Sequence, residues 1–305
     1  MKDEFKKFCD NIKLTANQKN DAKTKYQGVA KKLHESYYDT DYDGSTKLLF
    51  GSYKTKTHTR PLSTNQDVDV LFKIPQETFD KFDKYESNGQ SALLQEVKAL
   101  LNEKYSTTDD IKGWGKVILV KFADNTHNVE VLPAFELDDN TFLIPNSENG
   151  GSWEAFDPRK QLNAFNNSSS NTDGLSRELT QMLKTWVKNT SSLDYKSYKL
   201  LTDVIEFLKN NYQDGEDYDE YHNVLKDFLD FLKNRCSSEI LNYVNTAYNR
   251  VIKALEFMDD DKPKEASEEW RKIFGLEFPK VHQNPEKECK HKPRIIVNPA
   301  NPWSE

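Results

Sequence analysis

The segment that most constrains the fold is the run DVDVLFKI at residues 67–74, which begins with acidic and apolar side chains in alternation. A period of two is typical of a β-strand that has one face in a core. Asp67 and Asp69 then point to one side of the strand, and the valines that follow them point to the other. Because the valine face must be covered, the run predicts a sheet packed against helices.

The sequence on both sides of this run predicts the remaining elements of a small mixed sheet. We expect short strands at residues 47–50, 116–122, 128–132 and 141–145, the last at an edge. Helical spacing of apolar residues covers the chain up to about Tyr38, with Thr15 as N-cap, and returns over residues 79–105.

The composition changes after residue 162. Residues 163–173, NAFNNSSSNTD, are rich in Asn and Ser and are interpreted as a linker or mobile loop. Apolar residues then recur at helical spacing from Leu175 until a last short helix ends near Gly275, and a short strand is predicted at residues 295–297.

We therefore predict an α+β fold with an all-α second half and the site in the cleft between them. The expected units are a sheet-containing lobe with a long N-terminal helix at residues 1–160, a helical lobe at residues 161–280, and a tail at residues 281–305.

Charge and cysteine content restrict the partners. The formal net charge of -7 disfavours long-range capture of nucleic acid, although a local basic patch is compatible with it. Three widely spaced cysteines do not suggest a disulfide framework. The charged N-terminus and the lack of a long apolar run predict a cytoplasmic protein with no membrane partner.

The two aspartates also predict chemistry. Carboxylates this close repel each other unless a cation lies between them, and Mg²⁺ is the first candidate because it prefers oxygen ligands. Gly51 and Ser52 end the preceding strand, where a backbone N–H and a hydroxyl could receive the phosphates of a nucleoside triphosphate. Glu130, in NVEVLPAF, is the best candidate for a third carboxylate because it alternates with two valines.

These motifs resemble a known family. A strand ending in GS, then DVDV, then a carboxylate three residues before Pro in EVLPAF, is similar to the polymerase-β-type nucleotidyltransferases. The GSY, TRPLS, SWEAFDPRK and WRKIFGLEFP segments resemble the cGAS/DncV-like enzymes, the CD-NTases (SMODS/OAS-like) of bacterial CBASS anti-phage defence. The resemblance covers roughly residues 26–279.

The resemblance implies a site and a reaction. Asp67, Asp69 and Glu130 would hold two Mg²⁺ ions, with Mn²⁺ as an alternative, and Ser52 would contact the β- and γ-phosphates. Lys184 matches the family's phosphate-binding lysine, and Ser197 and Tyr198 match its phosphate-contacting serine and base-stacking tyrosine.

The reaction implied is condensation of nucleoside triphosphates, ATP first, into cyclic or short linear oligonucleotide second messengers with release of pyrophosphate. The third carboxylate of the family is usually Asp. A glutamate at position 130 is therefore expected to change the rate and the metal preference more than the class of reaction. No zinc-binding insertion is visible, so direct DNA sensing is not implied. A regulatory protein at the C-terminal tail is a further expectation.

Other interpretations stay open at this point. Glu130 could be an ordinary strand residue, Lys184 a solvated lysine, Ser197 a helix N-cap and Tyr198 a core residue. The rival functions are an RNA 3′-terminal nucleotidyltransferase, which the acidic charge disfavours, and a catalytically weak nucleotide-binding regulator, which the glutamate at position 130 leaves open.

Overall fold

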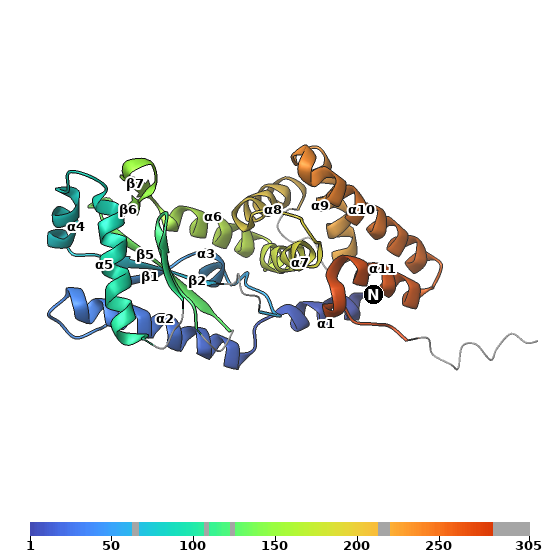
Figure 1. Ribbon diagram of the computed structural model, residues 1–305. Coiled ribbons are helices and arrows are strands. Elements are labelled where there is room, and N and C mark those ends of the chain that lie inside the picture. The colour runs from blue at the N-terminus through green and yellow to red at the C-terminus, as the bar shows by residue number, and fades with distance from the viewer. Residues whose placement is uncertain (63–66, 107–109, 123–125, 213–219, 283–305) are drawn as a thin grey trace, which may run out of the picture.

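The computed structural model describes residues 1–62, 67–106, 110–122, 126–212 and 220–282 (Figure 1). A sheet covered by helices forms one half of this part of the chain, and a bundle of helices forms the other (Figure 1). This is the α+β arrangement that the sequence predicts. The predicted strand at residues 295–297 lies outside the described residues.

Seven strands form the sheet within the described residues. They are β1 (Lys47–Leu49), β2 (Asp67–Lys73), β3 (Ile111–Trp114), β4 (Val117–Val120), β5 (Asn128–Glu136), β6 (Phe142–Asn146) and β7 (Ser152–Phe156). Their order is β1-β2-β5-β4-β3, and β6 joins β5 to β7. Among the described strands, β2 and β5 run parallel and the other pairs are antiparallel. β3 and β7 were not predicted from the sequence, and β6 pairs on both sides rather than forming an edge.

Helices cover the valine face of the sheet. α2 (Ala16–Tyr37) and α5 (Gly89–Lys104) pack on it, and Val68 and Val70 are fully buried in the core between them. Thr15 is the N-cap of α2, as predicted, and forms a capping box with Gln18. The helix predicted over residues 79–105 is instead two, because α4 (Gln76–Asp83) ends before α5 begins.

The second core belongs to the helical half. It is built by α7 (Leu175–Asn189), α8 (Ser197–Asn211), α9 (Tyr221–Lys233), α10 (Ser238–Asp259) and α11 (Pro263–Phe274), followed by the short 3₁₀ turn η2 (Gly275–Glu277). α1 (Lys2–Ile12) also belongs to this core, because Phe5, Phe8 and Ile12 are fully buried against it. The N-terminal residues were assigned to the sheet-containing lobe, and the structure places their side chains in the other.

The Asn- and Ser-rich run is not a linker. Most of it lies in α6 (Pro158–Asn171), which is continuous across residues 160 and 161 and passes between the sheet and helices α7 and α8 (Figure 1). Asp157 caps the helix by accepting from the backbone N–H groups of Arg159 and Lys160, and Phe165 is fully buried. Capping and burial outweigh the weak helix propensity of Asn and Ser.

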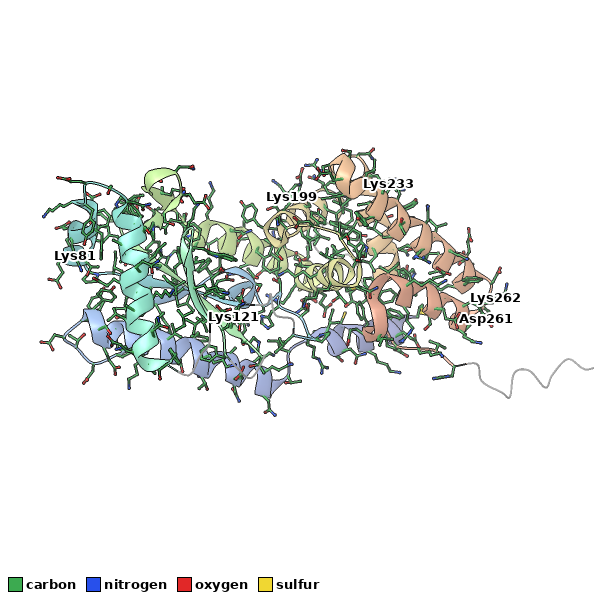
Figure 2. All side chains as sticks on the ribbon, viewed as in Figure 1. Lys81, Lys121, Lys199, Lys233, Asp261 and Lys262 are labelled. Atoms are coloured by element: carbon green, nitrogen blue, oxygen red, sulfur yellow. The ribbon has the colours of Figure 1, made fainter. Side chains whose placement is uncertain are left out.

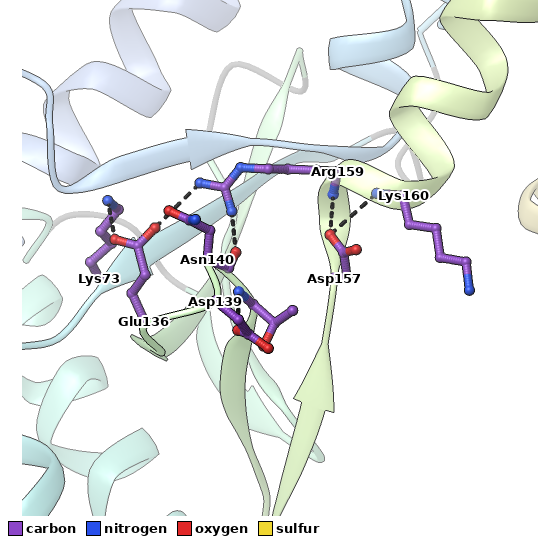
Figure 3. Close-up of polar contacts among 8 residues, drawn as sticks. Lys73, Glu136, Asp139, Asn140, Asp157, Arg159 and Lys160 are labelled. Atoms are coloured by element: carbon purple, nitrogen blue, oxygen red, sulfur yellow. Dashed lines mark hydrogen bonds and ion pairs between the residues drawn. The ribbon is translucent and has the colours of Figure 1, made fainter.

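The start of α6 is fastened to the sheet half (Figure 3). The Arg159 guanidinium donates to the Asn140 carbonyl and lies 3.3 Å from Glu136 Oε1, while Lys73 pairs with the same glutamate. These contacts link α6 to β2 and β5, the two strands that carry the predicted carboxylates. α6 therefore connects the two halves at the level of the site.

Candidate active site

Three carboxylates meet on two neighbouring strands. In the parallel β2–β5 pair, Asp69 stands directly opposite Glu130, and Asp67 stands opposite Asn128. The valines between them are buried on the other face, so all three acidic side chains leave the sheet on the same side. They line one cavity of about 370 Å³. Glu130 is therefore not an isolated strand residue.

The cavity makes these carboxylates hard to ionise together. Burial, and after it the charges of Glu130 and Asp67, together raise the pKa of Asp69 to about 7. Burial also raises the pKa of Asp67 and of Glu130. Lys121, labelled in Figure 2, opposes the rise at Asp67, as does a hydrogen bond of 3.0 Å from Asn128 Nδ2. A cation among these groups would favour their charged forms.

The donor set fits Mg²⁺ that shares its coordination with substrate. Among the described residues, no group of three or more His, Cys, Asp or Glu side chains is already arranged as a metal cage. Mg²⁺ usually takes one or two carboxylates and completes its shell with phosphate oxygens and water. Asp67, Asp69 and Glu130 beside an open cavity supply the first of these requirements.

Gly51 and Ser52 form the corner that faces the carboxylates. Gly51 has a φ of 62°, and a Cβ built on it would lie 2.0 Å from Asp69 Oδ2. Only glycine permits this approach between the corner and the carboxylate. The predicted turn is also the start of a short helix, α3 (Gly51–Thr55). Ser52 lines the cavity, as expected for a residue near the phosphates.

The helical half supplies the opposite wall. Lys184 of α7 lines the cavity and donates to Thr57 Oγ1 at 3.1 Å, so it is not a freely solvated lysine. Burial lowers its pKa to about 8, Lys188 contributes in the same direction, and Asp69 opposes the change. A lysine held between lobes beside carboxylates can receive the charge of a triphosphate.

The start of α8 also faces the cavity. Ser197 is the first residue of α8 and not its N-cap, which is Lys196, and no side chain caps this helix end. The Ser197 hydroxyl and the uncapped N–H groups suit an anion. Tyr198 is 68% exposed beside them, so its ring is available for stacking and is not part of the core.

A polar seam joins the two walls. One face of α7 donates to residues 55–59, the last residue of α3 and the segment that follows it. Arg177 donates to the Thr55 carbonyl, Gln181 to the carbonyls of Lys56 and His58, Lys184 to Thr57 Oγ1 and Lys188 to Thr59. These hydrogen bonds fix the distance between the carboxylates on the sheet and the cationic face of α7.

All eight residues predicted for the site line this one cavity: Gly51, Ser52, Asp67, Asp69, Glu130, Lys184, Ser197 and Tyr198. Other lining residues were not predicted, among them Thr57, Gln161, Lys188 and Tyr195. Lys188 stands four positions after Lys184 on one helix, a spacing that could have revealed it. Gln161 stands two residues before the run interpreted as a linker, and no motif pointed to it.

The fold and the site define a nucleotidyltransferase: paired carboxylates on adjacent strands, a glycine–serine corner opposite them, and a helical half that closes the cavity. Residues 1–169 match the domain family described as Second Messenger Oligonucleotide or Dinucleotide Synthetase, SMODS. The match covers more than half of the chain, and the chain belongs to this family.

Individual relatives agree with this assignment. A probable cyclic nucleotide synthase of Bacillus cereus (strain VD146) is 22% identical over 286 residues, 78% of this chain and 83% of that protein. CdnC of E. coli MS115-1, solved with ATP, superposes with a TM-score of 0.65 at 16% identity, covering 91% of this chain and 98% of that one. Vibrio cholerae DncV cyclic AMP-GMP synthase, solved with the linear intermediate 5′ pppA(3′,5′)pG, gives a TM-score of 0.67 at 15% identity over 88% and 93% of the two chains. At sequence identities of 15% and 16%, these two solved structures support the assignment of the fold and no more.

Proposed function

We propose that this chain uses divalent cations, Mg²⁺ first, to condense nucleoside triphosphates into a cyclic or short linear oligonucleotide with release of pyrophosphate. The observation that carries the proposal is the placement of Asp67, Asp69 and Glu130 in one cavity with Ser52 and Lys184. The family assignment supports a second-messenger product, and bacterial antiviral signalling is the setting that the resemblance favours.

Each wall of the cavity has a task in this reaction. Asp67, Asp69 and Glu130 would hold the cations, whose chemistry there would be activation of a ribose hydroxyl and neutralisation of charge on the phosphates. Ser52, Lys184 and Ser197 would bind and orient the triphosphate, and Tyr198 would stack on a base. Asn128, by its hydrogen bond to Asp67, would hold that carboxylate in place.

ATP is the first substrate to test, because a CdnC structure with ATP has the same fold. CdnC has also been solved in complex with HORMA-deltaN, which is consistent with a regulatory protein partner for this chain. The tail predicted to receive such a partner lies outside the described residues apart from residues 281 and 282. None of the helices in the described part of the chain is both long and apolar enough to cross a bilayer.

The test is synthesis by the purified full-length chain. Labelled nucleoside triphosphates with Mg²⁺ or Mn²⁺ should yield small phosphatase-resistant products, identified by mass spectrometry, and excess EDTA should abolish them. The double variant Asp67→Asn/Asp69→Asn should lose synthesis while its circular dichroism spectrum stays unchanged. Asp39→Asn/Asp41→Asn is the matched control, because these aspartates have the same spacing and are exposed.

The outcomes separate the rival functions. Products that form only after RNA is added would favour an RNA 3′-terminal nucleotidyltransferase. Nucleotide binding without turnover in any mixture of the four triphosphates would favour a binding regulator. Synthesis by the Asp67→Asn/Asp69→Asn variant at the rate of its control would remove these carboxylates from the reaction.

A further inference from the structure

A second cavity, of about 710 Å³, lies behind the seam between the two halves. α2, α3, α7 and the connection before α2 supply its walls, and none of the three carboxylates contributes to it. Its volume is in the range of ligand pockets and exceeds that of the catalytic cavity. His58 lines both cavities.

The charge of this cavity is opposite to that of the whole chain. Five basic side chains line it, Lys13, Lys19, Lys23, Lys56 and Arg177, against two acidic ones in a protein of formal net charge -7. Glu178, one of the acidic pair, is already engaged by Lys13 at 3.4 Å and by the Tyr221 hydroxyl. The excess positive charge suits a multiply charged anion.

Two buried polar atoms on its wall lack partners within the described part of the chain: Gln181 Oε1 and His58 Nδ1. The residues are only 4% and 7% exposed. The Gln181 amide cannot turn over to satisfy its oxygen, because its Nε2 already donates to two backbone carbonyls. Buried polar atoms of this kind are normally satisfied by a ligand or water.

Aromatic rings complete the wall. Tyr53 stacks on His58 with ring centroids 4.6 Å apart, and Tyr26 meets Tyr53 edge-on at 6.4 Å. Tyr26, Tyr53 and His58 all line the cavity. Flat rings beside hydrogen-bonding atoms accept a planar heterocycle that carries its own N–H groups.

We propose that this second cavity binds a nucleoside phosphate, with its phosphates against Lys19 and Lys23 and its base against the tyrosines and Gln181, and that the occupant adjusts the catalytic site. The role in catalysis rests on the proposed synthase function, and the binding does not.

The structure supplies a short route between the two cavities. Tyr53 follows Ser52 directly in the chain, and the Tyr53 ring stacks on His58. Gln181 precedes Lys184 by one turn of α7 and holds the same segment of chain. An occupant that contacts His58 and Gln181 would therefore touch residues that help to position both the glycine–serine corner and Lys184.

Binding is tested without metal and without turnover. Calorimetric titration of ATP, in EDTA, is compared between the full-length chain and Lys19→Glu/Lys23→Glu, whose two lysines are exposed on one face of α2. Lys6→Glu/Lys7→Glu on α1 is the control, with the same change of charge at exposed positions outside the cavity. Ser197→Ala/Tyr198→Ala removes contacts from the catalytic cavity only.

The expected result is an affinity at least tenfold weaker in Lys19→Glu/Lys23→Glu, and within about threefold of the original in the other two variants. Equal weakening by the α1 control would show non-specific charge attraction and overturn the site, and loss of binding in Ser197→Ala/Tyr198→Ala would place the ATP in the catalytic cavity. Inorganic tripolyphosphate that binds as tightly as ATP would overturn the nucleoside assignment.

Regulation has a separate readout. The Lys19→Glu/Lys23→Glu variant should make the same product, with its dependence of rate on ATP concentration shifted at least threefold. A rate curve that overlays the original would overturn the regulatory role. If the chain makes no oligonucleotide but binds ATP in EDTA with the expected lysine dependence, the proposed synthase function fails and the second cavity stands.

Discussion

Gly51→Ala should disable the enzyme while leaving it folded. The added Cβ would lie 2.0 Å from Asp69 Oδ2 and 2.8 Å from Asp69 Cγ, where ordinary contacts begin at 3.4 Å. The corner and the carboxylate must therefore separate by about 1.4 Å. A displacement of about 1 Å at a reacting centre can reduce the rate by about 10²-fold, so we expect a loss of at least that size.

The same substitution has a backbone cost that must be separated from the loss of activity. Gly51 has a φ of 62°, and a residue with a Cβ in this conformation is destabilised by roughly 1–2 kcal/mol. Gly150→Ala isolates this cost, because Gly150 has a φ of 93° and no atom of the described residues lies within 4 Å of its added Cβ.

The assay compares initial rates of oligonucleotide synthesis with thermal unfolding. Both variants should lower the unfolding temperature by a few degrees, and only Gly51→Ala should lose synthesis at a temperature where both are folded. Equal activity in the two variants would refute the argument that the corner and Asp69 must touch. A Gly51→Ala protein that does not fold would show that the backbone cost was underestimated.

Three further predictions follow from the same geometry. Glu130→Gln should reduce the initial rate about 10²-fold or more, and Glu130→Asp should retain more activity, as measured in Mg²⁺ and Mn²⁺. Burial lowers the pKa of His58 to about 4 from 6.5, so the unfolded chain binds the proton more tightly. The free energy of unfolding should then fall by up to about 3 kcal/mol between pH 6.5 and 4 and less in His58→Gln, as measured by urea titration. Tyr195→Phe should cost about 1–3 kcal/mol of unfolding free energy, since the buried Asp203 carboxylate would keep Lys199 as its one partner among the described residues, and thermal denaturation checks this.

The carboxylate strands could be predicted because their signal is local. Alternation of acidic and apolar residues fixes which face of a strand each side chain occupies, and a slip of one residue would turn the acidic side chains into the core. The sequence therefore placed Asp69 and Glu130 on the polar faces of their strands, and the structure adds that they stand opposite each other in β2 and β5. The cap at Thr15 is local in the same way, because its partner is three residues away.

α6 was missed because its helix is stabilised by distant parts of the chain. Residues 163–173 have the composition of a loop, and nothing within them favours a helix. The burial of Phe165 and the attachment of Arg159 to Glu136 and Asn140 supply the missing stabilisation. Tertiary contacts of this kind are absent from any local pattern.

The lysines of α7 show the limit of motif reasoning at the site. Lys184 was found through the family resemblance, whereas Lys188 and Gln181 on the same helical face were not. Their roles depend on the segment around Thr57, more than a hundred residues earlier in the chain. Only the folded chain shows that this segment is held by side chains of α7 and not by a strand partner.

The seam has a physical consequence for how the cavity can change shape. The sheet half and the helical half have separate apolar cores, and α7 meets the segment after α3 through side-chain hydrogen bonds to backbone and hydroxyl oxygens. Each such bond contributes only about 1 kcal/mol net, and water can replace it, whereas an apolar core resists any change of shape. The carboxylates and Lys184 therefore belong to different apolar cores, joined by α6 and by these polar contacts. A ligand that bonds to Gln181 Oε1 or to Arg177 would contact the same side chains that make the seam, so the cavity behind the seam is well placed to act on the cavity in front of it.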